Sequence, residues 1–339
     1  MNITIGIPTK NRYESLDKTL LSIALQTVSP YEVIIVDDSD NPINLTTIPH
    51  YEYIFRLFDE KGIKWQVKFG KKMGQHHSHQ MIQDMAETDW IFRIDDDCVA
   101  EPDVLRRLIG VIKSSIGNNI GAVAPSVTMP NPQPLPPGMR NTIKNLNSPN
   151  IQWFKGEGIH PAEHLYSCFL YRKGIAMYDL TLSSVAHREE TIFSHSIKRT
   201  GHTLYVNMDA QVHHFQGREG GIRTFRDPAL WEHDEKIFKA YLSLWNVIPE
   251  DNKMVVLDCG IGDHWAFKNI LPEMKQKYKK ITIAACFPDV FWDEPDLTII
   301  SIADAKNIYG DITPFQVYKL LWDTKEKIHL IEGFRRMYL

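Results

Sequence analysis

The sequence has few of the features that mark secreted or membrane-inserted proteins. Its four cysteines, Cys98, Cys168, Cys259 and Cys286, are scattered and form no CxxC pair. This arrangement argues against a disulfide framework or a structural zinc site and suits a reducing compartment, so we expect a cytoplasmic protein. No stretch approaches about 18 consecutive apolar residues, and the polar-interrupted start MNITIGIPTKNR is unlike a signal peptide. We therefore expect a soluble or peripheral protein without a transmembrane segment.

The chain also lacks an excess of positive charge. Its 38 Lys and Arg residues against 42 Asp and Glu residues give a formal net charge of -4 and a pI near 6.4. Without an overall cationic field, non-specific binding to DNA is not expected, and nucleic acid would have to bind at a local basic patch. With 339 residues, 43% hydrophobic and 24% charged, the chain is globular and long enough for two domains.

The N-terminal part of the chain alternates strand and helix patterns. Residues 3–7 predict a strand, residues 15–27 a helix with Ser15 as its N-cap, and residues 31–36 a second strand that is almost wholly apolar. A strand and a helix are again expected at 65–69 and 80–86. The order strand, helix, strand, with a second strand that is apolar throughout, indicates a buried parallel sheet of the α/β class.

Polar clusters follow three of the predicted strands. PTKNR lies at 8–12, DDSD at 37–40, and three consecutive aspartates at 95–97 after the apolar run that begins at Trp90. Ligands of such sheets bind at the carboxyl ends of the strands, so the three clusters should converge on one edge. Three adjacent carboxylates need a cation among them, and Mg²⁺ or Mn²⁺ would also bring a diphosphate as its own ligand. The alternative is a solvated acidic turn before the helix that begins near residues 101–103.

Lysines and histidines surround a glycine in the segment KKMGQHHSHQ at 71–80. Backbone amides can approach an anion closely at Gly74 and the side chains supply charge, which favours an anion site. A histidine metal cluster is the alternative. It is less favoured, because on a helix only His76 and His79 lie three residues apart and His77 points away.

Several motifs, in this order, resemble glycosyltransferase family 2. They are PTKNR after the first strand, IIVDDSD at the end of the second, the segment 74–80, IDDDCVAEPDVL, SCFLYRK at 167–173, HREETIFSHSIKRTG at 187–201 and AQVHH at 210–214. The resemblance covers about residues 1–225. It implies the GT-A fold, a Rossmann-like mixed and mainly parallel sheet flanked by helices, and an enzyme that uses a nucleotide-sugar donor.

The resemblance implies a role for each matching residue. Pro8, Thr9 and Asp38 would hold the nucleoside base, and Asp95 and Asp96 would contact ribose or a metal-bound water, Asp95 serving also as a metal ligand. The primary metal ligand would be Asp97 and the distal ligand His214, with His213 the alternative because either ring could point inward from a strand end. A neutral imidazole suits Mn²⁺ better than Mg²⁺. Further contacts to the nucleotide sugar, expected to be a UDP-sugar, would come from Asn11, Arg12, Lys72, Gly74, His79 and Arg172.

Two adjacent glutamates, Glu189 and Glu190, stand where the family commonly has Glu-Asp. An inverting transfer needs a carboxylate to take the proton from the acceptor hydroxyl as it attacks the anomeric carbon. The resemblance places Glu190 at the base position, and Glu189 would anchor the loop or bind the acceptor. Arg188 should hold both carboxylates ionised near neutral pH. The alternative is that both glutamates only enrich a helix N-terminus.

Two further stretches bear on domain organisation. Residues 129–138 contain five prolines and predict a surface excursion, and residues 141–164 are interpreted as a flap over the donor and acceptor, or as a packed insert. A strand at 254–257, a GxGD turn at 260–263, a helix at 265–278 and a strand at 281–286 weakly resemble part of a glycosyltransferase family 9 Rossmann domain. We expect a catalytic domain at 1–250 and an accessory domain at 251–339 for acceptor docking or self-association, with a vestigial nucleotide pocket as the alternative.

The motifs together predict a metal-dependent, inverting glycosyltransferase that acts on a glycan or glycoconjugate. Two alternatives stay open. One is a viral-type transferase that modifies hydroxymethylated DNA bases, against which the acidic balance counts. The other is a non-catalytic nucleotide- or carbohydrate-binding protein of the same fold.

Overall fold

The computed structural model describes residues 1–114, 119–128, 157–215, 220–221, 227–245, 252–278, 280–309, 318 and 328–339. The chain divides into two compact units, one made of residues 1–146 and 153–247 and the other of residues 147–152 and 248–339. The proline-rich stretch at 129–138 and most of the expected flap at 141–164 lie outside the described residues. Among the described residues, no helix is both long enough and apolar enough to span a membrane.

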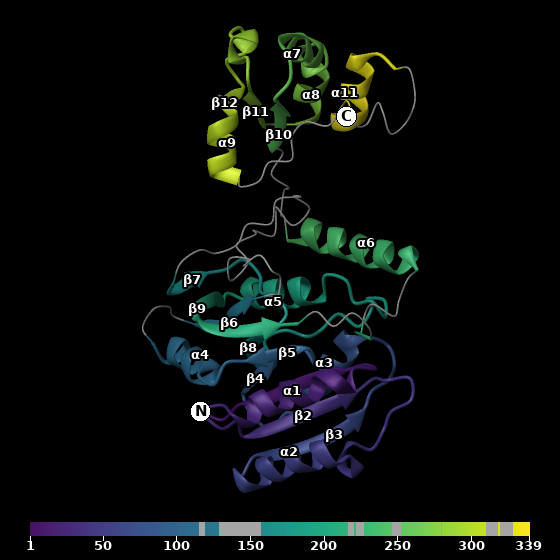
Figure 1. Cartoon of the computed structure of the whole chain (residues 1–339), viewed down its shortest axis with the longest axis vertical. Coiled ribbons are helices and arrows are strands. Elements are labelled where there is room, and N and C mark those ends of the chain that lie inside the picture. Colours follow the sequence, from purple (N-terminus) through teal and green to yellow (C-terminus); the bar gives the residue numbers. More distant parts are fainter. Residues whose placement is uncertain are drawn as a thin grey trace. The chain divides into compact units, whose positions relative to one another are not determined.

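One mixed sheet forms the centre of the first unit (Figure 1). Within the described part of the chain its main path has the order β3-β2-β1-β4-β8-β6-β9-β5, and β7 pairs with β9 beside it. Strands β1 to β4 are mutually parallel, whereas β8 runs antiparallel to both β4 and β6. The strands are β1 (Thr4–Thr9), β2 (Glu32–Asp37), β3 (Lys64–Phe69), β4 (Trp90–Arg93), β5 (Cys98–Ala100), β6 (Ile120–Thr128), β7 (Ile159–Pro161), β8 (Phe169–Arg172) and β9 (Thr203–His214).

Helices cover both faces of this sheet. Apolar side chains of α1, α2 and α4 pack in one hydrophobic cluster and those of α3 and α5 in another, and Figure 1 shows α1 and α2 alongside β2 and β3. The helices of this unit are α1 (Tyr13–Ala24), α2 (Pro49–Glu60), α3 (Gln75–Met85), α4 (Val104–Lys113), α5 (Glu189–Arg199) and α6 (Pro228–Leu244), with a short 3₁₀ turn, η1, at Leu45–Thr47.

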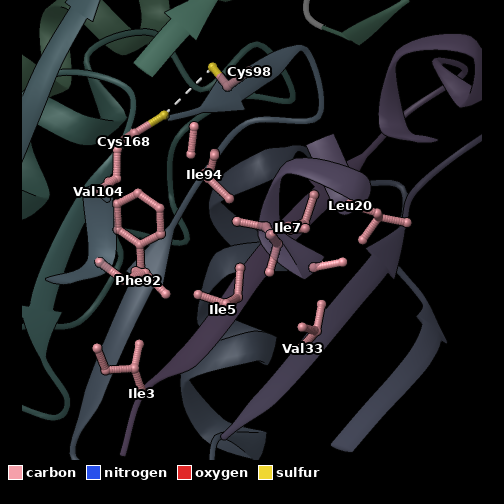
Figure 2. Close-up of a cluster of buried hydrophobic side chains, with 14 of the residues drawn as sticks. Ile3, Ile5, Ile7, Leu20, Val33, Phe92, Ile94, Cys98, Val104 and Cys168 are labelled. Carbon is pink, nitrogen blue, oxygen red and sulfur yellow. Dashed lines mark hydrogen bonds between the residues drawn. The ribbon is translucent and has the colours of Figure 1, made fainter. Parts of the chain in front are cut away.

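Buried side chains alternate along the central strands. In β2, Val33 and Ile35 belong to the first cluster, while the intervening Ile34 belongs to the second. This is the period of two expected for a strand covered on both faces, and it explains why the strand is apolar throughout. Figure 2 shows part of the first cluster, where Ile5 and Ile7 of β1 lie beside Phe92 of the neighbouring strand β4.

Two local expectations were wrong in detail. Ser15 does not cap α1, because the helix begins at Tyr13 and the N-cap position is Arg12; the Ser15 hydroxyl donates to the Arg12 carbonyl at 3.1 Å. Helix α3 begins at Gln75 rather than at residue 80, so the histidines lie within the helix. His76 and His79 are both buried, which makes them core side chains rather than parts of an open anion loop.

The second unit contains a three-stranded parallel sheet of order β10-β11-β12. Its elements are β10 (Asn252–Leu257), α7 (Ile261–Lys268), α8 (Leu271–Lys277), β11 (Lys280–Ala285), the 3₁₀ helix η4 (Pro288–Phe291), β12 (Thr298–Ile300), α9 (Ile302–Tyr309) and α11 (Leu330–Tyr338). Phe267 and Phe334 lie in its core with ring centroids 5.5 Å apart. This unit therefore has a hydrophobic core of its own.

The single helix expected at 265–278 is two helices, α7 and α8. Pro272 stands in the first turn of α8, where its missing N–H costs nothing. It could not have continued α7, because a proline ring clashes with the carbonyl four residues earlier. Helix α7 begins at Ile261, so Gly262 and Asp263 of the GxGD sequence are helical and do not form an open turn.

Candidate active site

A pocket opens at the carboxyl ends of the parallel strands, where the three polar clusters meet. It is lined by Pro8, Thr9, Lys10, Arg12, Asp38, Gly74, Gln75, Ser78, Arg93, Asp95, Asp96, Asp97, Tyr166, Ser167, Ser184, Val185, Ala186, His187, Arg188, Glu190, His214, Gly221 and Trp231. The convergence follows from topology, because β1, β2 and β4 run parallel and each ends in one of the polar clusters. A concave site with several convergent polar groups is the default location for ligand binding.

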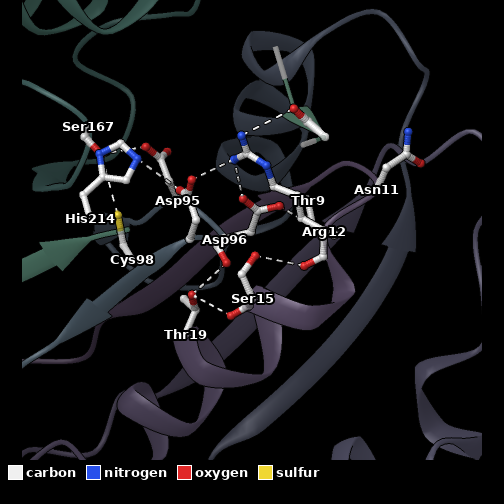
Figure 3. A network of polar contacts seen from close by, with 12 residues as sticks. Thr9, Asn11, Arg12, Ser15, Thr19, Asp95, Asp96, Cys98, Ser167 and His214 are labelled. Carbon is white, nitrogen blue, oxygen red and sulfur yellow. Dashed lines mark hydrogen bonds and ion pairs between the residues drawn. The ribbon is translucent and has the colours of Figure 1, made fainter. Parts of the chain in front are cut away.

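The aspartate cluster is buried and is held from several sides (Figure 3). Asp96, only 4% exposed, accepts a hydrogen bond from the Thr9 hydroxyl at 2.8 Å, and the Thr19 hydroxyl donates to its carbonyl at 3.0 Å. The Ser167 hydroxyl donates to Asp95 at 2.6 Å. Burial, opposed mainly by the charge of Arg12, raises the pKa of Asp96 to about 7. The cluster is therefore an enclosed site and not a solvated acidic turn.

Arg12 is the cation nearest to Asp96. Its Nη1 lies 3.1 Å from an oxygen of Asp96 and 3.1 Å from Oδ2 of Asp97, with the Arg12 side chain only 12% exposed. Gly220 and Gly221 pack against this side chain with positive φ, and a Cβ at Gly221 would come within 2.8 Å of the guanidinium carbon. Burial lowers the pKa of Arg12, but the charges of Asp96 and Asp97 outweigh burial and raise it overall. The guanidinium thus offsets part of the negative charge of the cluster.

His214 approaches the other oxygen of Asp97. Its Nε2 lies 3.1 Å from Asp97 Oδ1, while Arg12 holds Oδ2. Burial alone would lower the pKa of His214, but the hydrogen bond to Asp97 and the charge of Asp95 raise it to about 9. In this state the imidazole is protonated at neutral pH, and a metal ion would have to displace that proton.

One group of side chains could hold a metal ion. Ligand atoms of Asp95, Asp97, Cys98 and His214 all lie within 4.8 Å of one another. Carboxylate oxygens and an imidazole nitrogen are donors that Mn²⁺ accepts. Burial raises the pKa of the Cys98 thiol well above its ordinary value, so this group stays a neutral neighbour of the site. The donor set therefore fits the expected ion.

His213 does not belong to this group. In the β5–β9 pair His214 stands opposite Cys98, whereas His213 stands opposite Val99, and neighbouring residues of a strand point to opposite faces. The His213 ring contacts Thr128 at 2.9 Å and Glu101 at 3.2 Å. The geometry therefore favours His214 over His213 as the potential metal ligand.

Asp38 and Gly74 join two loops at the pocket. The backbone N–H of Lys72 donates to Asp38, and burial, opposed by the amides of Lys72 and Gly74, raises the pKa of Asp38. Gly74 has φ 110°, and a Cβ there would lie 2.8 Å from the carbonyl oxygen of Ser184. Only glycine permits this close approach, which brings the 72–75 segment against the segment before α5.

The two glutamates have different surroundings. Glu189, 1% exposed, forms a two-pronged ion pair with both terminal nitrogens of Arg93, and Gln75 donates to it at 3.2 Å. Arg93 is itself 1% exposed and donates from Nε to the Ser167 carbonyl at 3.0 Å. These contacts anchor the start of α5 to the aspartate strand, in agreement with a structural role for Glu189.

Glu190 lies on the pocket wall, and its pKa differs from what was expected. Burial, followed by the charge of Glu189, raises the pKa of Glu190 to about 7. The cation that opposes this rise is Arg93, whereas the Nε of Arg188 lies 3.3 Å from Glu235. The arginine that pairs with the glutamates is Arg93, and it pairs with Glu189.

Four predicted donor contacts lie away from the pocket lining. Arg172 is paired with Trp90, because β8 runs antiparallel to β4 and its carboxyl end points away from the aspartates. His79 is 1% exposed and stacks on Tyr178 with ring centroids 5.4 Å apart. Asn11 points away from the carboxylates in Figure 3 and donates to Asp40 at 2.8 Å, and the Lys72 ammonium donates to the Asp40 carbonyl at 2.8 Å. Arg172 and His79 are therefore not part of the pocket lining, and Asn11 and Lys72 contact the 38–40 loop.

Sequence reasoning missed several residues of the site. Arg93 carried a signal, since it is a charged residue inside an otherwise apolar strand. Ser167 and His187 begin two of the family motifs but were not assigned to the site, and Tyr166 and Trp231 carried no signal, because a single residue in a loop or on an amphipathic helix does not reveal which pocket it lines.

The comparisons with known proteins agree with this geometry. The family profile of glycosyl transferase family 2 matches residues 4–176. The structure of S. aureus TarS superposes with a TM-score of 0.51 and 15% identity over 82% of this chain and 43% of TarS. TarS 1-349 in complex with UDP-GlcNAc superposes with a TM-score of 0.52 and 14% identity, over 92% of this chain and 77% of that structure. GalNAc-T7 with UDP, GalNAc and Mn²⁺ superposes with a TM-score of 0.56 and 12% identity, over 91% of this chain and 58% of GalNAc-T7. No curated protein sequence matches the chain.

The mixed α/β sheet flanked by helices matches these solved structures, and the GT-A expectation for the fold is confirmed. The chain belongs to glycosyl transferase family 2, because the family match spans more than half of its residues. It covers less than half of the length of TarS and less than two thirds of GalNAc-T7. The resemblance of the second unit to family 9 stays a prediction.

Proposed function

We propose that this chain is a metal-dependent, inverting glycosyltransferase that moves a sugar from a nucleotide diphosphate to a hydroxyl group of a glycan or glycoconjugate. The observation that carries the proposal is one pocket lined both by a potential metal group, Asp95, Asp97 and His214, and by a carboxylate of raised pKa, Glu190. Perturbed carboxylates beside a charged cluster in a cleft are typical of catalytic sites.

The donor would bind at the strand ends. Pro8, Thr9 and Asp38 would contact the nucleoside, and Arg12 would offset the charge of the diphosphate. Mn²⁺ or Mg²⁺, held by Asp97, Asp95 and His214, would supply a Lewis acid for the leaving diphosphate. A UDP-sugar is the preferred donor, since TarS and GalNAc-T7 have been crystallised with UDP-GlcNAc and with UDP and Mn²⁺.

Glu190 would act as the general base. The acceptor oxygen forms a bond to the anomeric carbon, the bond from that carbon to the diphosphate oxygen breaks, and the acceptor proton passes to the Glu190 carboxylate. A pKa of about 7 suits this role, because the carboxylate is a stronger base than an ordinary glutamate and is still largely ionised slightly above neutral pH. Glu189 would be a positioning residue that holds the start of α5 through Arg93.

The second unit, which we assign to residues 251–339, would serve acceptor docking or self-association. This proposal is supported by its separate hydrophobic core and its small parallel sheet.

A donor-hydrolysis screen tests the proposed function. Purified protein is incubated with UDP-, GDP-, ADP- and TDP-sugars in Mn²⁺, and free nucleotide diphosphate is measured with and without EDTA. We expect hydrolysis of one donor class, dependent on metal and lost in Asp97→Asn. Equal rates in EDTA, or no hydrolysis of any donor together with no nucleotide binding, would refute the proposal.

A further inference from the structure

The pocket has a wall that the donor motifs do not supply. Tyr166, His187 and Trp231 line it together with Glu190. Tyr166 precedes β8, His187 precedes α5, and Trp231 lies near the start of α6. Three separate segments therefore contribute aromatic rings to the pocket that Glu190 also lines.

A buried aspartate fixes this wall. Asp234, 0% exposed, accepts hydrogen bonds from the backbone N–H and the hydroxyl of Ser183, at 2.6 and 2.9 Å, and from the N–H of His187 at 2.8 Å. Ala186 and Arg188 on either side of His187 have positive φ. Strained backbone of this kind persists only where surrounding contacts hold it, and it is concentrated at functional sites. Helix α6 is thus fastened to the segment that leads into the proposed base.

Trp231 shares a helix face with these anchors. It lies three residues before Asp234 and four before Glu235, a spacing that puts all three side chains on one side of α6. Its ring packs against His187 with centroids 4.8 Å apart, and His187 Nε2 lies 3.5 Å from Glu235. Trp231 is only partly buried, so part of its indole faces the pocket.

This combination suits a sugar ring. A pyranose has a flat apolar C–H face and a rim of hydroxyl groups, which need an aromatic surface and hydrogen-bonding groups around it. The Trp231 ring packs on the imidazole of His187, and Glu190 supplies a carboxylate to the lining of the same pocket. A simple amino-acid hydroxyl would leave such an aromatic surface unused.

We propose that Trp231 is the acceptor-binding platform and that the acceptor is a pyranose of a glycan, stacked on the indole with one hydroxyl directed to Glu190. This inference rests on the proposed function and adds the class of acceptor. A nucleobase could also stack on an indole. The carboxylate of Glu190 in the same pocket disfavours the phosphodiester backbone that would accompany a base in DNA.

The test is saturation-transfer NMR on the full chain in the presence of UDP and Mn²⁺. The probes are the methyl glycosides of glucose, galactose, mannose and N-acetylglucosamine, with 5-hydroxymethyl-2′-deoxycytidine as the competing ligand class. We compare wild type with Trp231→Ala, Trp231→Phe and the control Trp292→Ala. Trp292 is 82% exposed and belongs to the second unit, so its loss should leave the signal unchanged.

We expect saturation of the ring protons of at least one pyranoside by wild type and Trp292→Ala. Trp231→Ala should weaken this signal about tenfold and Trp231→Phe should retain most of it, because phenyl still offers an apolar face. Trp292→Ala should keep donor hydrolysis at the wild-type rate, and thermal unfolding should show a cooperative transition for every variant. An unchanged signal in Trp231→Ala, no pyranoside contact in wild type, or contact only with the nucleoside would overturn the inference. If wild type still hydrolyses the donor in any of these cases, the proposed function stands and only the acceptor platform is refuted. If wild type does not bind the donor, the proposed function itself is refuted.

Discussion

Replacing Glu190 by Gln should slow transfer strongly while sparing the fold. Replacing Glu189 by Gln should lower the stability of the fold and affect the transfer rate much less. Glu190 faces the pocket, whereas Glu189 satisfies a fully buried Arg93. Removing one partner of a buried ion pair costs about 3–5 kcal/mol, a large part of the roughly 5–15 kcal/mol that stabilises a typical domain. Loss of a general base slows a reaction by about 10²–10⁴-fold. The two variants carry the same chemical change one residue apart, so each serves as the control for the other.

The pH dependence sharpens this prediction. Because the pKa of Glu190 is about 7, kcat/KM for transfer should fall about tenfold per pH unit below 7 in wild type, and this acid limb should vanish in Glu190→Gln. Stability should show the opposite trend. The folded state holds the Glu190 proton more tightly than the unfolded chain does, so this contribution is complete below the ordinary value of 4.5 and is lost as pH rises through about 7. Between pH 5 and pH 8 the Tm of wild type should therefore fall relative to the Tm of Glu190→Gln, which has no carboxyl group to titrate at this position.

The assay combines thermal unfolding, nucleotide binding by calorimetry and transfer to an acceptor glycoside across pH 5 to 9. Near-normal transfer in Glu190→Gln, with a folded but inactive Glu189→Gln, would reverse the assignment. Unaffected transfer in both variants would remove the base from this pair of residues.

Four further outcomes follow from the site. Asp97→Asn should lower donor hydrolysis by at least about 100-fold and weaken Mn²⁺ binding in calorimetry, because it removes the carboxylate charge shared by Arg12 and His214. Circular dichroism checks that the variant is folded, and normal Mn²⁺ affinity would contradict this prediction. Arg12→Gln should weaken UDP binding yet strengthen binding of Mn²⁺ alone, because it removes a cation that neutralises Asp96 and Asp97; weaker binding of both would show that Arg12 only supports the fold. Gly74→Ala should reduce nucleotide binding, because the new methyl group would lie 2.8 Å from the Ser184 carbonyl oxygen on a backbone with φ 110°. Gly110→Ala is the control and should leave nucleotide binding unchanged, because the added Cβ meets no atom within 4 Å. A chain ending at residue 251 should still bind UDP and hydrolyse donor while losing transfer to a glycan, and a folded truncation that no longer binds UDP would refute an accessory role for the second unit.

Local sequence patterns predicted strands β1 to β4 and the edge where the polar ends of β1, β2 and β4 meet. Apolar runs that end in Asp37 and in Asp95 predict parallel strands whose carboxyl ends share an edge, and that edge is where the pocket lies. The pattern of buried residues in β2 follows equally from its own composition.

Contacts between distant segments could not be predicted in the same way. Arg172 was expected at the site because it ends a strand, but the direction of β8 depends on its pairing with β4 and not on its own residues. The pairing of Arg93 with Glu189 joins residues 96 positions apart, and neither residue identifies its partner in the sequence. The wrong role for Arg188 has the same origin, since its partner Glu235 comes from α6.

The central claim is that the acidic group at the strand ends binds a nucleotide diphosphate through a metal ion. A crystal structure with UDP and Mn²⁺, with data collected at the manganese absorption edge, tests it most directly. We predict one anomalous peak in contact with Asp97 and His214, with the diphosphate on the same ion and the uracil beside Asp38. A fully bound UDP without such a peak, or manganese bound elsewhere while the imidazole of His214 still contacts Asp97, would contradict the account.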